Sequence, residues 1–191
     1  MRLAILDHGH GVRAKAMFAL IRVFSGHPVV DAVKLALYRP SFYRGGSLTQ
    51  EAMRGPSDWS VADRELMAAF VSKVNNTEFC IAAHTATSAL AYKDGAKVSA
   101  ALADLETAPL TEPLRSTLRM LGKLTRENNL DVDDISRVLA AGVSEQQIKD
   151  ALAVALAFNV TDRLADVFDF AVGDPKAINA GAKYLLARGY R

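Results

Sequence analysis

Residues 55–90, GPSDWSVADRELMAAFVSKVNNTEFCIAAHTATSAL, decide the fold of this 191-residue chain. Ser60 and Asp63 have the spacing of a capping box, in which each side chain accepts from the backbone N–H of the other, so a helix should begin directly after Ser60. Asn75-Asn76-Thr77 interrupts that helix, and a second one should run from about Glu78 to Tyr92. The stretch therefore predicts two consecutive helices joined by a short turn.

The rest of the chain is also predicted to be helical, because apolar residues recur at helical spacing and sustained period-two alternation is missing from the sequence. Further helices are expected at about 12–24, 28–38, within the loop-rich stretch 41–60, and at 97–105, 114–127, 131–141, 144–170 and 175–189. The connections are short and polar. We therefore predict an all-α protein with a single compact multi-helix domain over residues 1–191.

The composition is that of an ordinary globular protein, with 50% hydrophobic and 23% charged residues. The 23 basic and 21 acidic residues are scattered and give a net charge of +2, so we expect neither a nucleic-acid-binding nor a membrane-binding surface. A single cysteine excludes an intramolecular disulfide, and the apolar run near the N-terminus is too short for a signal peptide. We expect a soluble, cytoplasmic protein.

Within this stretch, Cys80 and His84 have side chains that could take part in catalysis. Their spacing of four puts both side chains on one face of the expected helix. Cys80 falls in the first turn, where unpaired N–H groups favour an anion, so the sequence predicts a lowered thiol pKa. If the turn at 75–77 folds the helices antiparallel, Glu65 approaches the pair and completes a proton relay. A buried structural cysteine and a solvated Glu65 are the more frequent arrangement in proteins.

The quoted stretch resembles the core of alkylhydroperoxidase D-like proteins, the superfamily that includes the carboxymuconolactone decarboxylases, and it is most similar to the branch called peroxidase-related. That family has a Glu, a CxxC pair beginning twelve residues later, and a His four residues beyond the second cysteine. Glu65, Cys80 and His84 occupy these positions at the family's spacings. Residues 38–46 and 124–173 resemble the branch as well. The resemblance covers nearly the whole chain and implies the alkylhydroperoxidase D-like fold.

The chain departs from the family's pattern at two positions. Thr77 stands where the family has its first cysteine, and Phe79 stands where some members have another histidine. In the family the two cysteines reduce a peroxide and close into a disulfide that an outside reductant reopens. Thr77 cannot take part in that step, so the dithiol cycle is not available to this chain.

The resemblance therefore implies a thiol-dependent, peroxidase-like antioxidant oxidoreductase with one remaining cysteine. Cys80 would be the nucleophile, His84 the proton acceptor and Glu65 the relay carboxylate. The expected substrate is a peroxide or a related electrophile, and an external thiol would restore oxidised Cys80. Two alternatives stay open: a thiol-independent, carboxymuconolactone decarboxylase-like lyase that uses His84, and a non-catalytic protein that binds a small molecule.

No metal and no organic cofactor is implied by the resemblance, and family members generally form homo-oligomers, so we expect a dimer, trimer or hexamer. The segment Asp7-His8-Gly9-His10 has the residue types of a metal site. Its glycine and its place near the terminus favour a turn instead.

Overall fold

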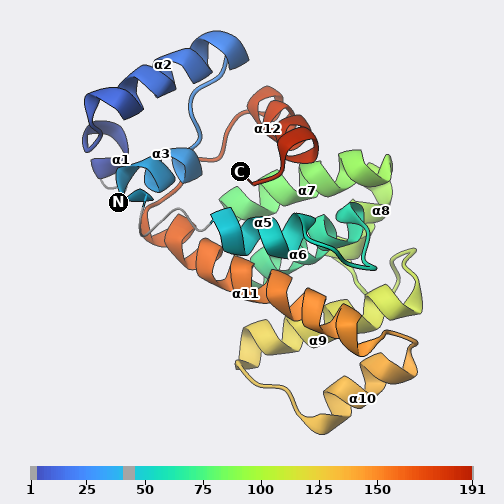
Figure 1. Cartoon of the computed structure of the whole chain (residues 1–191). Coiled ribbons are helices and arrows are strands. Elements are labelled where there is room, and N and C mark those ends of the chain that lie inside the picture. The colour runs from blue at the N-terminus through green and yellow to red at the C-terminus, as the bar shows by residue number, and fades with distance from the viewer. Residues whose placement is uncertain (1–3, 41–45, 191) are drawn as a thin grey trace.

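The computed structural model describes residues 4–40 and 46–190, and within these ranges the chain consists of helices and connecting turns, without a strand. The helices are α1 (Ile5–His8), α2 (Val12–Ser25), α3 (Asp31–Tyr38), α5 (Gly46–Arg54), α6 (Val61–Asn75), α7 (Glu78–Tyr92), α8 (Gly95–Ala103), α9 (Glu112–Glu127), α10 (Val132–Ala140), α11 (Glu145–Val167) and α12 (Pro175–Arg188). The prediction of an all-α chain is confirmed (Figure 1).

Helix α6 lies at the centre of the molecule. It packs against α5, α7, α8, α9 and α11, and nine of its fifteen residues are buried. The predicted capping box forms at its start, where the Asp63 N–H donates to the Ser60 hydroxyl and the Ser60 N–H donates to the Asp63 carboxylate, both at 3.1 Å. Asn76 adopts a left-handed conformation with φ 59° and ends the helix. The α6–α7 hairpin therefore follows from signals within residues 55–90.

The main core is a cluster of apolar side chains from α5 to α11. Trp59 connects two helices of this core. Its indole N–H donates to the Gln147 carbonyl at 2.8 Å and so joins the start of α6 to the start of α11. A capping box of Ser144 and Gln147 starts α11. Figure 1 shows α11 crossing beside α6 and α5, which puts residues far apart in the sequence next to the hairpin.

A second, smaller apolar cluster joins the N-terminal helices to the hairpin. Its buried members are Leu6, Leu35, Cys80, Ala165, Phe168 and Phe170, which come from α1, α3, α7, the end of α11 and the segment directly after it. The single cysteine of the chain, Cys80, belongs to this cluster.

Two helix boundaries differ from the prediction by several residues. The helix expected from position 28 begins at Asp31, because Val30 is still extended and the Asp31 carboxylate accepts from the Ala171 N–H at 2.8 Å. The helix expected to reach position 170 ends at Val167, since Asp169 takes a left-handed φ of 52°.

The segment Asp7–His10 contributes to the packing of the N-terminal helices. Asp7 and His8 belong to α1, where a turn was predicted. The His10 ring nitrogen Nε2 lies 2.8 Å from the Lys34 carbonyl oxygen, and its ring meets the edge of Phe18. In the part of the chain that the structure describes, no cluster of three His, Cys, Asp or Glu side chains could hold a metal ion.

Helix α2 stands away from the core (Figure 1), and none of its fourteen residues, all described, is buried. Among the described helices, none is both long enough and apolar enough to cross a membrane.

Candidate active site

The hairpin brings Glu65 of α6 and His84 of α7 into direct contact. The His84 Nδ1 lies 2.7 Å from the Glu65 Oε2, and the two residues are 5% and 0% exposed. The sequence made this approach conditional on the turn at residues 75–77, and the structure folds the turn in that way. Glu65 is therefore buried, although a glutamate in a helix is usually exposed to solvent.

Two further side chains reach the other carboxylate oxygen. The Arg54 Nη2 donates to the Glu65 Oε1 at 2.6 Å, and the Tyr190 hydroxyl donates to the same oxygen at 2.9 Å. The Tyr190 ring stacks on the His84 ring with 18° between the planes, and the Arg54 guanidinium lies 5.1 Å from the centre of the Tyr190 ring. Arg54 also donates to the Leu185 carbonyl at 3.1 Å. The four side chains form one closed network.

The network keeps Glu65 ionised. Burial alone would raise the pKa of the Glu65 carboxyl, but the hydrogen bond and charge of His84, together with the charge of Arg54, outweigh it and hold the pKa below its usual range. The pKa of Tyr190 is raised well above its usual value, first by burial and then by the negative charge of Glu65. The Tyr190 hydroxyl therefore keeps its proton and remains a donor.

An ionised Glu65 decides which nitrogen of His84 carries the hydrogen. Because the carboxylate can only accept, Nδ1 is the donor, and in the neutral ring Nε2 then keeps its lone pair. No hydrogen bond within the described residues reaches Nε2. The ring is held from one side by the edge of Phe158, with 4.5 Å between ring centres. This is the arrangement of an imidazole prepared to take up a proton.

Cys80 is in a different environment from the one predicted. Cys80 is 1% exposed and lies within the second apolar cluster. Burial raises the pKa of the thiol, and the charge and hydrogen bond of Asp162 and the charge of Asp166 raise it further. Cys80 does lie in the first turn of α7 as predicted, but the lowered pKa is wrong, because burial and two carboxylates on α11 outweigh the helix dipole.

Several solved structures have folds similar to this one, and three of them are described below. An uncharacterised peroxidase-related protein from Silicibacter sp. TM1040 is 22% identical, with a TM-score of 0.74 over 86% of each chain. The alkylhydroperoxidase AhpD core of a peroxidase-related protein from Ralstonia eutropha JMP134 is 16% identical, with a TM-score of 0.75 over 92% of this chain and 93% of that one. This chain has the alkylhydroperoxidase D-like fold.

The third structure with this fold is the debrominase Bmp8, which is 13% identical with a TM-score of 0.68 over 90% of this chain and 91% of that one. No family model matches the sequence, and no curated protein matches it. The expectation of an alkylhydroperoxidase D-like fold is confirmed, and it is carried by structure rather than by sequence identity.

Thr77, which the sequence resemblance places at the family's first cysteine, makes a structural contact. Its hydroxyl donates to the Asp166 carboxylate at 2.8 Å and ties the start of α7 to α11. The neighbouring carboxylate of Asp162 accepts from Ser72 and from Asn75, each at 2.8 Å. A buried polar cluster therefore surrounds the sulfur on the side of α11.

Sequence reasoning missed Arg54, Tyr190 and Asp162 as members of the site. Tyr190 is 125 residues from Glu65 in sequence. Asp162 lies on α11, and the capping box of α11 predicts where that helix begins but not which residues it packs against. The apolar context of Asp162, within AFNVTDRLADVF, was a signal that this acid faces the interior.

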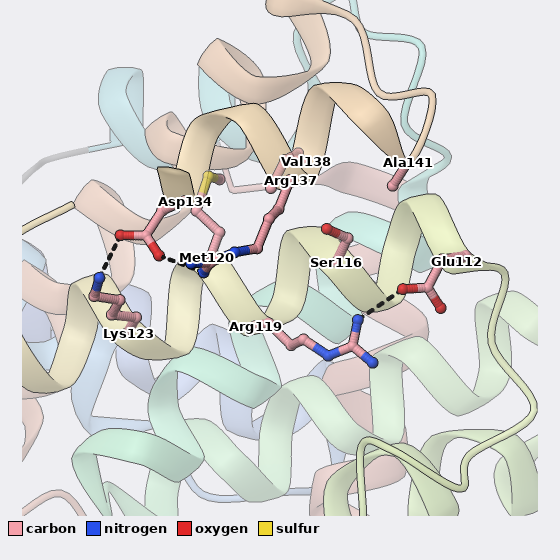
Figure 2. Close-up of a pocket in the computed structure, with 9 residues that line it drawn as sticks. All are labelled: Glu112, Ser116, Arg119, Met120, Lys123, Asp134, Arg137, Val138 and Ala141. Atoms are coloured by element: carbon pink, nitrogen blue, oxygen red, sulfur yellow. Dashed lines mark hydrogen bonds and ion pairs between the residues drawn. The ribbon is translucent and has the colours of Figure 1, made fainter. Parts of the chain in front are cut away.

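A separate hollow of about 400 Å³ lies between α9 and α10 (Figure 2). Its charged lining residues pair with one another: Arg119 donates to Glu112 at 2.7 Å, while Lys123 and Arg137 both contact Asp134. Each charged side chain of the lining therefore has a partner of opposite charge. It shares no residue with the Glu65–His84 pair, so we assign the candidate site to that pair.

Proposed function

We propose that this chain is an enzyme in which His84, oriented by Glu65, moves a proton to and from a small-molecule substrate without using a thiol. The observation that carries the proposal is the buried 2.7 Å contact between the His84 Nδ1 and the Glu65 Oε2. A carboxylate at one ring nitrogen fixes the tautomer and stabilises the imidazolium that forms when the other nitrogen accepts a proton. Chemistry of this class is that of the decarboxylase branch of the superfamily.

The position of the thiol supports the same choice. A thiolate is the reactive form of cysteine, and both burial and the carboxylate of Asp162 disfavour it at Cys80. His84 is not subject to this restriction, because its Nδ1 already contacts the Glu65 carboxylate and no hydrogen bond within the described residues occupies its Nε2.

The test measures the turnover of a carboxymuconolactone by the wild type and by two variants. Loss of the carboxyl group is the signal that is recorded. We expect His84→Ala to lose about 10²–10⁴-fold in kcat, the usual contribution of a general base, while Cys80→Ser keeps the wild-type rate. His27→Ala is the matched control, because His27 lies outside the site. An unchanged rate in His84→Ala would contradict the proposal.

A second candidate is peroxide reduction by Cys80 alone, favoured by the place of Cys80 on α7 one turn before His84 and by the two similar structures named peroxidase-related. The sulfur would attack the peroxide O–O bond, releasing an alcohol or water and leaving a sulfenic acid. Two equivalents of an external thiol would then return Cys80 to the thiol, with release of water and formation of a disulfide between them. Peroxide consumption that is lost in Cys80→Ser, together with no turnover of the carboxymuconolactone by the wild type, would select this candidate over the first.

The assembly predicted from the resemblance, a dimer, trimer or hexamer, belongs to the proposal as well. Light scattering on the purified full chain measures its mass directly, and a monomer would contradict this part of the proposal.

A further inference from the structure

Tyr190 comes from the end of the chain and meets both members of the proposed proton-transfer pair. Its hydroxyl is 2.9 Å from the Glu65 Oε1 and 3.3 Å from the His84 Nδ1. Figure 1 shows how this happens, since α12 lies beside α7 and the chain turns back towards α5 after it.

The turn that delivers Tyr190 is held by its backbone. Gly189 adopts φ 69°, which favours glycine, and a Cβ there would lie 2.5 Å from the Gln50 side-chain oxygen. The same oxygen accepts from the Tyr190 N–H at 2.7 Å. The Gln50 side chain on α5 therefore fixes where the phenol ring enters, and its close approach leaves room only for glycine at position 189.

The two oxygens of Glu65 have separate partners as a result. Oε1 accepts from Arg54 and from Tyr190, and Oε2 accepts from His84. A carboxylate oxygen that already accepts two hydrogen bonds is a weaker acceptor for a third, so the occupied Oε1 leaves Oε2 for the imidazole.

We propose that Tyr190 is a positioning residue for His84. Its hydroxyl donates to the Glu65 Oε1, and its oxygen lies 3.3 Å from the His84 Nδ1 as a second acceptor for the Nδ1–H, so that Nδ1 carries the hydrogen and Nε2 is left unprotonated in the neutral ring. The inference rests on the proposed function for its catalytic meaning, but the tautomer is a property of the folded chain and can be measured without any substrate.

The test compares Tyr190→Phe with Tyr184→Phe in the full chain. Phenylalanine keeps the ring that stacks on His84 and removes only the hydroxyl, while Tyr184 on the same helix is 54% exposed and serves as the matched control. The nitrogen-15 chemical shifts of the His84 ring report which nitrogen carries the hydrogen.

We expect the ratio of the Nδ1–H to the Nε2–H tautomer to fall about fivefold in Tyr190→Phe, because the Nδ1–H loses the hydroxyl oxygen 3.3 Å away as a second acceptor, and to stay at the wild-type value in Tyr184→Phe. An unchanged ratio in folded Tyr190→Phe would overturn the inference. A changed ratio together with full turnover in His84→Ala would leave Tyr190 as a positioning residue and refute the proposed function instead.

Discussion

Replacing Glu65 by Gln removes one negative charge from the centre of the network and leaves its shape almost unchanged. The Arg54 side chain, 11% exposed, then has no anion beside its Nη2. Removing one partner of a buried ion pair costs about 3–5 kcal/mol, because the other charge stays buried and uncompensated. Arg54 keeps its bonds to the Met53 and Leu185 carbonyls, so we expect the lower end, about 3 kcal/mol.

Urea unfolding followed by circular dichroism measures this cost. With an m value of about 2 kcal/mol/M, the midpoint of Glu65→Gln should fall by about 1.5 M urea. Glu106→Gln is the matched control, since Glu106 also pairs with an arginine but its side chain is 58% exposed, and its midpoint should stay close to that of the wild type. Equal shifts in the two variants would refute the reasoning.

The cost should also depend on pH in a defined direction. The pKa of Glu65 is lowered in the folded chain, so the unfolded chain binds more protons than the folded one when the pH falls below the unfolded value of about 4.3. The stability that Glu65 contributes is therefore fully present above that pH and is lost as the pH falls through the folded pKa. The difference between wild type and Glu65→Gln should be constant at neutral pH and shrink in acid.

Three further predictions concern the thiol and the packing of α9. Leu35→Ala opens the apolar cluster over Cys80, so the rate of thiol alkylation, followed by mass spectrometry, should rise at least about tenfold at equal pH. Asp162→Asn removes a carboxylate that raises the thiol pKa, so alkylation of Cys80 should begin at lower pH than in the wild type. Gly122→Ala puts a methyl group 3.0 Å from the Phe70 ring and should cost about 1 kcal/mol in urea unfolding.

Matched variants separate these effects from general loosening. Leu139→Ala, at a half-exposed leucine of α10, should leave the alkylation rate unchanged. Gly181→Ala lies on α12 with no atom within 4 Å of the new methyl group, so it should stabilise the chain by up to about 1 kcal/mol through helix propensity. If Gly181→Ala and Gly122→Ala changed the midpoint alike, packing against Phe70 would not be the cause.

The helices were predictable where local signals specify them. The capping boxes of Ser60 and Ser144 use side chains three residues apart, and Asn76 ends α6 by its own tolerance of a left-handed conformation. The Glu65–His84 contact was within reach of the sequence for the same reason, since a tight turn between two helices brings their facing side chains together.

The remaining features depend on contacts between distant segments. The pKa of Cys80 is raised first by burial and then by Asp162 from α11, and the second oxygen of Glu65 is occupied by Arg54 and Tyr190 from opposite parts of the chain. Neither periodicity nor capping carries information about such partners. The thiol pKa was therefore predicted in the wrong direction from a helix position that was itself correct.

The central place of α6 has a consequence for the timescales on which the site comes apart. Amide hydrogens of a helix enclosed by five others exchange with solvent only when the whole domain opens, whereas a helix such as α12, with Ala182 as the one buried residue of its described length, can detach by itself. In deuterium oxide, the backbone around Glu65 should remain protonated long after the segment that ends in Tyr190 has exchanged. The contact between Glu65 and His84 would then persist through many openings of α12, whereas the Tyr190 hydroxyl would contact the pair only part of the time.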